Sequence, residues 1–521
     1  VLGAKAHGLI MLRRLGLPVP AGFVISTEVC RAVLRDGCFP EGFAAELTAA
    51  IGDLETATQR RLGGSERPLT VSVRSGAAVS MPGMMDTVLN VGLTATAARG
   101  LTTETGNPQF ASIARLRFLS NFASAITGTG AESVVAEAIQ QNRGNEQSGI
   151  RHAIDIIEAL VSEQVGQQVP HDAFRQLELA ITAVCSSWDT PRARTFRAIH
   201  DIPHDLGTAV TVQAMVFGHR DRHSGTGVAF SRDPNTGERI PFGDLLFGSQ
   251  GDDVVAGRSP TLPLGELADR EPGVWAQLVA ALDRIEACYR DSCCIEFTFE
   301  GGEFWILQVH RGKVAAAAAV HIAVALAEEG LIGHREALRR ITRLQLQHAR
   351  TPRMILDSTA DILARGQGAC PGVAVGRVAT TPDTAVRMAA HGPVILVRPD
   401  TSPLDMHGLA AAAGVLTAHG GPTCHAAVVA RSMGKPAVVG VADLTIDATT
   451  IRIGRHVIPA GTLIAIDGTG GEITAGNPPI GTTTAPHVHR LLEWADQISG
   501  DNTKRSDAER LSAAHTALRC Q

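Results

Sequence analysis

The clearest candidate for chemistry in this sequence is a histidine at the start of an expected helix. His425 lies in the string GGPTCHAAVVAR, residues 420–431. Two glycines and a proline end an expected strand, Thr423 can cap the following helix, and small apolar residues continue that helix. The helix dipole disfavours an imidazolium ion in the first turn and stabilises negative charge there. We therefore expect a neutral, nucleophilic histidine that can carry a phosphoryl group.

An isolated histidine at a tight turn is more often structural than catalytic, and the twelve surrounding residues decide between the two interpretations. They closely resemble the GGxTSHAAVVAR motif of the phosphohistidine domain shared by pyruvate, phosphate dikinase and phosphoenolpyruvate synthase. The resemblance implies that His425 is the phosphoryl carrier. It also matches Thr423 to a threonine that is regulated by phosphorylation in some family members, although a plain helix N-cap explains Thr423 equally well. Cys424 is expected to be a small filler, not a nucleophile.

Two segments near the start of the chain suggest a nucleotide site. The string LGAKAHGL, residues 2–9, is similar to the family's LGGKGANL, which opens an ATP-grasp fold, and the resemblance places Lys5 on the phosphates of ATP. Arg74, at the end of an expected strand, offers a planar fork for phosphate oxygens. The string SMPGMMDT that follows, residues 80–87, suits a mobile loop that closes over a triphosphate. This string also favours the dikinase over the synthase.

Further along the chain, the resemblance identifies adenine-binding and metal-binding residues. The strings TAVTVQAMVFG and TGVAFSRDPNTGE match the dikinase pattern, and by that match the residues from Gln213 through Met215 to Val216 line the adenine pocket. Residues 250–257, QGDDVVAG, resemble the family's QGEDVVAG. Glu296 and Gln308 lie on neighbouring expected strands, where a carboxylate and an amide suit Mg²⁺ bridging phosphate oxygens.

Two positions depart from the family's pattern at the phosphate end of this site. Cys294 replaces the Asp of the family's DIEF segment, and His310 replaces the Arg of LQTR. Cysteine is a soft ligand and a poor substitute for a hard oxygen on Mg²⁺. Histidine cannot make the bidentate phosphate contact of Arg, and Arg311, one strand position on, points to the opposite face.

Composition excludes several other classes of protein. The chain has 521 residues, 44% hydrophobic and 19% charged, with a net charge of −5, which argues against a nucleic-acid partner. Nine cysteines without a CxxC pair indicate reduced thiols. No apolar run reaches the ~18–20 residues of a membrane span, and no signal peptide is visible. We therefore expect a cytoplasmic protein with no membrane contact. The chain starts with Val inside a motif. The sequence therefore leaves open whether a first strand precedes it.

Residue patterns predict the order of the elements. Strands are expected in LPVPAGFVIS, LTVSVRSG and TVLNVGL, with a helix around Gly8–Leu15. Residues 110–200 have helical spacing, strands return from Gly207 to about Val309, and helices are expected over about Ala315–Arg343. From Gly368 to Gly476 strands and helices alternate, as in a compact α/β domain.

The pattern and the resemblance together predict an α/β and α+β multidomain protein. An ATP-grasp nucleotide-binding domain with a helical insertion is followed by a swivelling β/α phosphohistidine domain. The expected boundaries are 1–345 for the first domain with its helical subdomain at 110–200, 346–366 for a linker, 367–477 for the phosphohistidine domain, and 478–521 for a second linker and the truncated start of a barrel region.

The leading hypothesis for function is a pyruvate, phosphate dikinase-like phosphotransferase. The resemblance implies that ATP and inorganic phosphate phosphorylate His425 with release of AMP and pyrophosphate, with Mg²⁺ as cofactor. It further implies transfer to pyruvate through a barrel domain, supplied in trans or lost, and a homo-oligomer. Cys294 and His310 motivate a second hypothesis, a degenerate nucleotide-binding module. Cys424 is the only hint of a third, a phosphoenolpyruvate synthase-like phosphotransferase.

Overall fold

The computed structural model describes residues 2–79, 81, 84–128, 146–165, 168–199, 201–256, 261–356, 362–484, 486–501 and 503–519. The chain divides into two compact units. The first comprises Val1–Arg220 and Trp305–Gln308, and the second comprises Asp221–Phe304 and Val309–Gln521.

The first unit is built on an antiparallel sheet with the strand order β1-β6-β4-β5. Its β-branched residues favour the extended backbone, and their inward-facing members are fully buried, among them Val73 and Val212. The strands are β1 (Gly22–Ile25), β4 (Val71–Gly76), β5 (Thr87–Val91) and β6 (Ala209–Ala214). The short strands β2 (Arg61–Leu62) and β3 (Pro68–Leu69) pair beside it.

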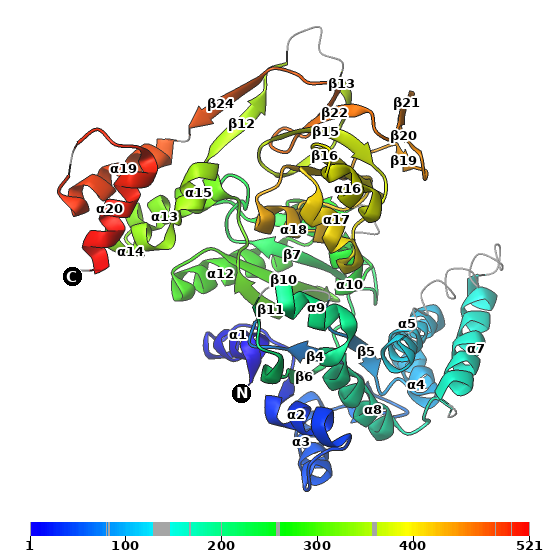
Figure 1. Ribbon diagram of the computed structural model, residues 1–521. Coiled ribbons are helices and arrows are strands. Elements are labelled where there is room, and N and C mark those ends of the chain that lie inside the picture. The colour runs from blue at the N-terminus through cyan, green and yellow to red at the C-terminus, as the bar shows by residue number, and fades with distance from the viewer. Residues whose placement is uncertain are drawn as a thin grey trace. The chain divides into compact units, whose positions relative to one another are not determined.

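Helices surround this sheet, and α5 runs beside α7 in Figure 1. Residues of α2, α3, α5, α7 and α8 share one apolar core with the sheet. The helical spacing predicted for residues 110–200 is confirmed where the structure describes it, and residues 129–145 of that span lie outside the described residues. The helices are α1 (Gly3–Arg14), α2 (Thr27–Asp36), α3 (Phe43–Thr58), α4 (Ala95–Thr105), α5 (Pro108–Thr127), α7 (Glu146–Val165), α8 (Ala173–Ser186) and α9 (Pro191–Ile199), with 3₁₀ turns η1 (Ser187–Asp189) and η2 (His204–Leu206).

The second unit begins with a five-stranded sheet in the order β11-β10-β7-β8-β9. Phe230, Phe297 and Phe299 are among its buried side chains, and residues of α12 are buried in the same unit. The strands are β7 (Gly225–Phe230), β8 (Phe242–Phe247), β9 (Leu262–Pro263), β10 (Cys293–Glu300) and β11 (Glu303–Arg311), and the helices are α10 (Gly251–Ala256), α11 (Glu266–Arg270) and α12 (Pro272–Tyr289).

An eight-stranded sheet follows in the same unit, in the order β13-β23-β22-β15-β16-β17-β18-β14. The neighbours β15, β16, β17 and β18 run parallel, as the alternation of strands and helices predicted. The strands are β13 (Ile362–Arg365), β14 (Gln367–Cys370), β15 (Val373–Ala379), β16 (Val394–Arg398), β17 (Gly414–Thr417), β18 (Ala437–Val439), β22 (Leu463–Asp467) and β23 (Glu472–Ala475), with helices α16 (Pro382–Ala389), α17 (Met406–Ala411) and α18 (His425–Met433) and the turn η3 (Pro403–Asp405). A separate sheet joins β19 (Leu444–Ile446), β20 (Thr450–Ile453) and β21 (His456–Pro459).

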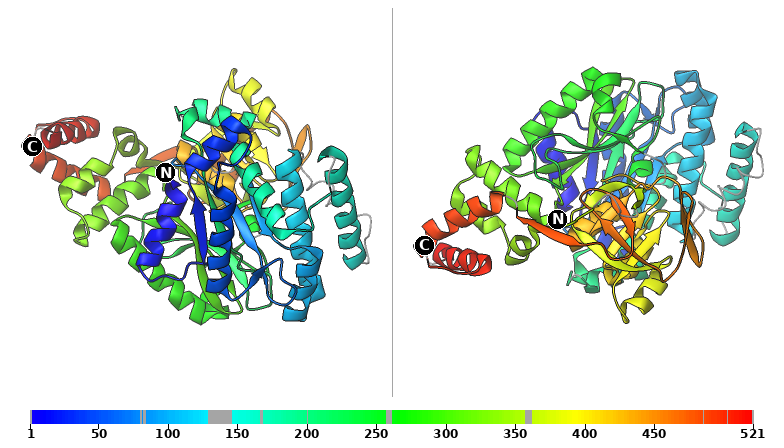
Figure 2. Two further views of the ribbon diagram at one scale, coloured as in Figure 1. Left: turned by 90° about the horizontal axis from the view of Figure 1, so that it is seen from below. Right: turned by 90° about the horizontal axis from the view of Figure 1, so that it is seen from above.

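Helices from two distant parts of the sequence share a third core in the second unit. In Figure 2, as in Figure 1, the C-terminal helices lie beside the helices that follow β11, with Trp494 buried between them. The helices are α13 (Ala316–Glu328), α14 (His334–Arg340), α15 (Arg343–His348), α19 (Pro486–Ser499) and α20 (Asp507–Arg519). A two-stranded ribbon, β12 (Arg350–Met354) with β24 (Ile480–Thr484), lies in the spans predicted as linkers.

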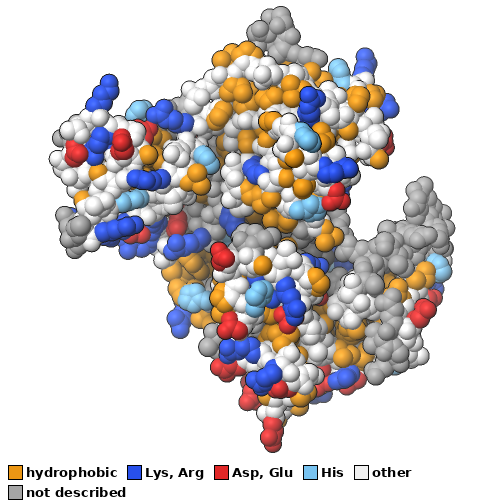
Figure 3. Space-filling model, viewed as in Figure 1, with side chains coloured by type: hydrophobic (Ala, Val, Ile, Leu, Met, Phe, Trp, Pro, Cys, Tyr) orange, Lys and Arg blue, Asp and Glu red, His pale blue; other side chains and the backbone are white. Residues whose placement is uncertain are grey.

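The predicted fold class, a multidomain protein of α/β and α+β parts, is confirmed by these sheets and helices. On the face shown in Figure 3, basic and acidic side chains are interspersed. Among the described helices, none has the length and apolar character that crossing a membrane requires. The division of the chain into domains and linkers with boundaries at 345, 366 and 477 stays a prediction.

Candidate phosphohistidine and nucleotide sites

His425 is the first residue of helix α18, as the motif predicted. The chain reaches it from β17 through a turn that the Cys424 N–H closes by donating to the Gly421 carbonyl at 3.1 Å. The N-cap residue is Cys424, whose extended backbone (φ −64°, ψ 167°) starts the helix. The interpretation of Thr423 as the helix N-cap is therefore wrong, because the cap lies one residue later.

A threonine from another turn holds the imidazole ring. The Thr401 hydroxyl oxygen lies 3.0 Å from His425 Nδ1. Thr401 is buried, and it follows β16 just before the turn η3. When Nδ1 carries the ring proton and donates it to Thr401, Nε2 keeps a free lone pair. The contact is therefore compatible with the tautomer in which Nε2 is the nucleophile.

Burial keeps the ring neutral. It lowers the pKa of His425 from its ordinary value, and the nearby Asp405 carboxylate partly offsets this effect. Asp405 is itself fixed, because it accepts hydrogen bonds from the Ser402 N–H at 2.7 Å and the Ser402 hydroxyl at 3.0 Å. Arg398 Nε lies 3.3 Å from the other Asp405 oxygen. A neutral ring at the positive end of a helix can act as a nucleophile near pH 7.

Thr423 is bound to an acidic residue from the five-stranded sheet. Asp244, on β8, accepts hydrogen bonds from the Thr423 backbone N–H at 2.7 Å and from the Thr423 hydroxyl. Its other oxygen accepts from the Thr261 hydroxyl at 3.0 Å. Burial raises the pKa of Asp244 above the ordinary aspartate value, and these hydrogen bonds partly offset the rise. Sequence reasoning gave no role to Asp244.

Cys424 packs as a small core residue, as expected from its sequence context. Its side chain is 5% exposed and contacts the apolar cluster between α18 and the parallel strands. Burial raises the pKa of its thiol to about 11, so the thiolate is scarce near neutral pH.

The structure brings together two of the predicted ATP-binding residues in the first unit. Arg74, on β4, donates from Nη2 to the Gln308 side-chain oxygen at 3.0 Å and from Nη1 to the Leu307 carbonyl at 3.3 Å. These bonds orient the planar guanidinium. Arg74 and Gln308 therefore form one preorganised donor group.

Lys5 lies in the first turn of α1, which packs against the end of the same strand. The Ala4 N–H donates to the Ala77 carbonyl at 3.1 Å. Gly3, at φ +76°, is where α1 comes closest to β4, since a Cβ there would lie 1.6 Å from the Gly76 carbonyl oxygen. Only glycine fits this position. The helix begins at Gly3, earlier than the expected Gly8, and so Lys5 is a helical residue near Arg74's strand.

The string SMPGMMDT is a loop where it is described, but part of it is buried. Met81 and Met84 are 8% and 3% exposed and pack with Trp188. Arg192, on α9, donates to the Met84 carbonyl at 3.2 Å and forms an ion pair with Asp86. Positions 80, 82 and 83 lie outside the described residues. Closure of this loop over a triphosphate stays a prediction.

The predicted adenine residues lie at and just after the end of β6. Gln213 is 2% exposed, and its side-chain amide donates to the Pro20 carbonyl at 3.2 Å. Met215 is half-buried, and its N–H donates to the Thr70 carbonyl at 2.9 Å. Val216 is 8% exposed. The Gln213 side chain therefore anchors the strand, and the half-buried Met215 is the more open of the three.

Glu296 lies on β10 of the second unit, where it is half-buried and pairs in register with Val228. Cys294, on the same face of that strand, is 1% exposed in a small apolar cluster. Burial raises the pKa of the Cys294 thiol well above its ordinary value, so the neutral thiol supplies no ligand charge. Within the described part of the chain, no group of three or more His, Cys, Asp or Glu side chains could hold a metal ion.

The other departure from the family's pattern lies at the end of β11. His310 is exposed, and its Nδ1 lies 3.0 Å from the Arg311 carbonyl. Arg311 Nη1 lies 3.6 Å from the Asp291 carboxylate. Arg311 is therefore engaged by Asp291.

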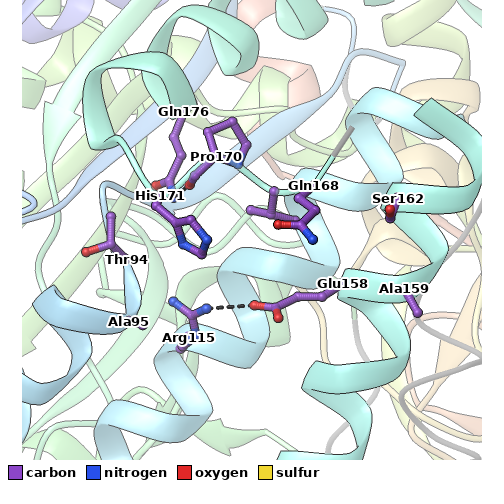
Figure 4. Close-up of a pocket in the computed structure, with 11 residues that line it drawn as sticks. Thr94, Ala95, Arg115, Glu158, Ala159, Ser162, Gln168, Pro170, His171 and Gln176 are labelled. Atoms are coloured by element: carbon purple, nitrogen blue, oxygen red, sulfur yellow. Dashed lines mark hydrogen bonds and ion pairs between the residues drawn. The ribbon is translucent and has the colours of Figure 1, made fainter. Parts of the chain in front are cut away.

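A cavity of about 280 Å³ lies among α4, α5, α7 and α8, and none of the predicted site residues lines it. Figure 4 shows Arg115 and Glu158 facing one another across it, with Nη2 of the arginine 2.7 Å from the carboxylate. Arg115 also donates to the Leu93 carbonyl at 3.1 Å, and both side-chain ends of Gln176 are bound to backbone. The charges in this cavity pair with each other.

Comparisons with known proteins extend over both units. The family model for the AMP/ATP-binding domain of pyruvate phosphate dikinase matches residues 34–261, and the model for the mobile domain of PEP-utilising enzymes matches residues 390–471. The pyruvate, phosphate dikinase of Rhizobium meliloti is 40% identical in an alignment that covers 99% of this chain and 60% of that protein. The enzyme of Clostridium symbiosum is 38% identical over 96% of this chain and 59% of its own length. The chloroplastic enzyme of Flaveria trinervia is 39% identical over 95% of this chain and 54% of its own length. The chain thus spans about 60% of the length of the curated relatives that it matches.

Proposed function

This chain belongs to the pyruvate, phosphate dikinase family, and from that premise we propose that it transfers a phosphoryl group from ATP to His425. ATP and inorganic phosphate give AMP and pyrophosphate, and one phosphoryl group stays on the histidine. Phosphorus balances, because AMP keeps one phosphate, pyrophosphate takes two and His425 takes one. The final acceptor in this proposal is pyruvate, which becomes phosphoenolpyruvate at a barrel domain.

The observation that carries the proposal is the arrangement of His425. A buried threonine holds Nδ1, burial lowers the pKa of the ring, and the ring stands on the first residue of a helix. Nε2 attacks the β-phosphorus of ATP with its free lone pair, while the Nδ1 proton stays on the Thr401 hydrogen bond. The bond from that phosphorus to the AMP oxygen breaks and AMP leaves, and the γ-phosphoryl group passes to inorganic phosphate, which becomes pyrophosphate. The first-turn N–H groups then stabilise the charge of the phosphoryl group. Nucleophile activation and product stabilisation thus come from one turn.

In the nucleotide half, Lys5 and Arg74 bind phosphate oxygens, and Gln308 orients Arg74 through the 3.0 Å hydrogen bond. Gln213, Met215 and Val216 form the adenine side of the site. The buried, backbone-bound Gln213 acts by fixing the strand. Met215, which is more exposed, is the residue expected to meet the base.

Mg²⁺ is the implied cofactor, and Glu296 is its proposed protein ligand. Mg²⁺ usually keeps several waters and is held by one or two carboxylates together with substrate phosphates. Glu296 is half-buried, and among the described residues it belongs to no group of three or more potential metal ligands, which fits that mode of binding. Bound there, the ion would supply neutralisation of phosphate charge. Cys294 cannot assist, because its thiol is neutral and lies in an apolar cluster.

Several finer points are part of the same proposal. Thr423 is a regulatory site, the barrel domain is supplied in trans, the protein is a homo-oligomer, and it works in the cytoplasm. The predicted linkers, 346–366 and the beginning of 478–521, contain the paired strands β12 and β24 and let the carrier domain swing.

The test is the intact mass of the chain after incubation with ATP, Mg²⁺ and phosphate. We expect an acid-labile gain of one phosphoryl group, with AMP and pyrophosphate as products. His425→Ala should abolish the gain, whereas His419→Ala, at an exposed histidine six residues earlier, should keep it. Nucleotide binding without phosphorylation in the folded chain would overturn the proposal in favour of a degenerate binding module. Release of phosphate in place of pyrophosphate would favour synthase-like chemistry.

A further inference from the structure

A threonine on the central strand of the first sheet is an immediate neighbour of Arg74. Val73 of β4 and Val212 of β6 belong to the apolar core, so Arg74 and Thr211, one position along each strand, point to the other face of the sheet. The antiparallel register pairs Arg74 directly with Thr211. Two side chains paired in this way lie on one face, with their Cβ atoms about 5 Å apart.

The hydroxyl of Thr211 is buried and has no hydrogen-bond partner among the described residues. The whole residue is 2% exposed. Its neighbours on the same face are engaged, since the Ser72 hydroxyl donates to the Gln213 carbonyl at 3.4 Å and the Gln213 amide donates to the Pro20 carbonyl at 3.2 Å. An unsatisfied buried hydroxyl destabilises the free protein, so its presence at this place indicates a partner that arrives from outside the chain.

Beside this hydroxyl, the backbone of Gly76 leaves a small space. A Cβ on Gly76 would lie 3.6 Å from Lys5 Cβ and 3.8 Å from the Thr211 hydroxyl oxygen, and no atom outside the adjoining residues would lie closer. These are ordinary van der Waals contacts, and Gly76 does not have a positive φ. Neither sterics nor backbone conformation therefore requires glycine here, and the missing side chain keeps room for one atom between Thr211 and Lys5.

The space lies toward the phosphate end of the proposed nucleotide site. Along β6, Thr211 comes between Gln213, on the proposed adenine side, and Ala209, which pairs with Gly76 at the end of β4. Lys5 borders the same space from α1. A phosphate oxygen is the acceptor that ATP would bring to this place, and a hydrogen bond to a charged oxygen is stronger than one to a neutral oxygen.

We propose that the Thr211 hydroxyl donates a hydrogen bond to a phosphate oxygen of bound ATP, which occupies the space over Gly76 between Thr211 and Lys5. The inference rests on the proposed function, because Lys5 and Arg74 bring the phosphates to this face of the sheet. The hydroxyl lacks a partner in the free chain and gains a charged one in the complex. Its removal therefore weakens nucleotide binding without destabilising the free chain.

Titration calorimetry with the β,γ-imido analogue of ATP and Mg²⁺ measures the contact without turnover. Thr211→Val keeps the branched shape and removes the hydroxyl, so its Kd should rise about tenfold or more. Thr211→Ser should restore most of the affinity. Thr48→Val, at an exposed threonine on α3, is the control and should leave the Kd unchanged.

Gly76→Ala tests the space independently of the hydroxyl. Its methyl group fits the free chain but occupies the position of the phosphate oxygen, so the Kd should again rise about tenfold or more. The ³¹P resonances of the bound analogue give a direct signature. They should differ between the wild-type chain and Thr211→Val at saturation, because a donor to phosphate has been lost.

Unfolding of the ligand-free chain in urea distinguishes a ligand contact from a structural role. Thr211→Val should not lower the midpoint, because its hydroxyl has no partner to lose. Thr208→Val, in the same sheet, should lower it, since the Thr208 hydroxyl accepts from the Gly76 N–H at 3.1 Å and donates to the Ala209 carbonyl at 2.8 Å. Gly76→Ala should keep the midpoint or raise it.

The outcomes separate the inference from the proposed function. Wild-type affinity in Thr211→Val or in Gly76→Ala overturns the inference, and so do unchanged ³¹P resonances or a lowered midpoint in Thr211→Val. In these cases the wild-type chain still binds the analogue and the proposed function stands. If the wild-type chain binds no nucleotide, the proposed function fails and the inference fails with it. If Thr211→Val does not fold, the hydroxyl has a structural role and the inference is likewise rejected.

Discussion

At the scale of the residue, the proposed reactivity of His425 depends on Thr401, 24 positions earlier in the chain. Thr401 lies after β16 and His425 after β17, and these two strands are parallel neighbours. The carboxyl ends of parallel strands meet at one edge of a sheet, which is where α/β proteins place their ligands. The signal for Thr401 in the sequence was thus a hydroxyl residue following the strand VILVR.

Substitution of Thr401 tests this dependence. Thr401→Val keeps the shape but removes the hydroxyl, so the neutral ring should sample both tautomers and the rate of phosphorylation should fall about threefold to tenfold. The ¹⁵N shifts of the two ring nitrogens should move with it, while nucleotide affinity stays constant. Thr401→Ser should restore both readouts. A wild-type rate and wild-type shifts in Thr401→Val would exclude a positioning role.

At the scale of the element, the proposed nucleotide site depends on how one helix is seated. Helix α1 carries Lys5, and its first residue is packed on the end of β4, the strand that carries Arg74. This seating needs the positive φ and the absent side chain of Gly3. The helix positions the lysine, and the glycine positions the helix.

Gly3→Ala should displace the start of α1 from the end of β4. The substitution adds left-handed strain of about 1–2 kcal/mol and a clash with the Gly76 carbonyl, so we expect weaker ATP binding and a lower midpoint in urea. Gly52→Ala is the control, and we expect it to change stability in the opposite direction. Gly52 is exposed within α3 and a Cβ there meets nothing within 4 Å, so alanine should raise stability by about 0.5–1 kcal/mol. Equal midpoints for the two variants would contradict the seating of α1.

At the scale of the whole molecule, each unit has its own core, and the second also has a buried ion cluster. Arg232, 1% exposed, pairs with Glu286 of α12 and Glu329 at the end of α13, at 2.7 Å each. Ser231 donates to Glu286 as well. The cluster joins the segment after β7 to α12 and to the end of α13.

Removal of one partner should leave an uncompensated buried charge. We expect Glu286→Ala to lower the free energy of unfolding of the second unit by about 3–5 kcal/mol in urea titration. Asp283→Ala, on the same helix in an exposed pair with Arg239, should cost less than about 1 kcal/mol. A loss of similar size in both variants would show that the buried cluster contributes no more to the free energy of unfolding than the exposed pair does.

Local patterns in the sequence were enough to predict the elements and the place of His425. Enrichment in Val, Ile and Thr marked the strands of the first sheet, and the run GGPTCHAAVVAR placed His425 at the start of a helix, because strand, turn and cap preferences act over a few residues. The family of the chain followed from the same strings. The nearby residues Arg74 and Gln308 were both named, but their hydrogen bond was not.

The tertiary structure decided the contacts between distant segments. Nothing in the sequence separates Asp244 from other aspartates, since its role follows from lying 179 positions away from Thr423 and yet within a hydrogen bond of it. The same holds for Thr401, for the N-cap at Cys424, and for Met81 and Met84, which were expected in a mobile loop and are buried against Trp188. Burial and long-range hydrogen bonds depend on the packing of whole sheets and helices, and local residue patterns do not encode that packing.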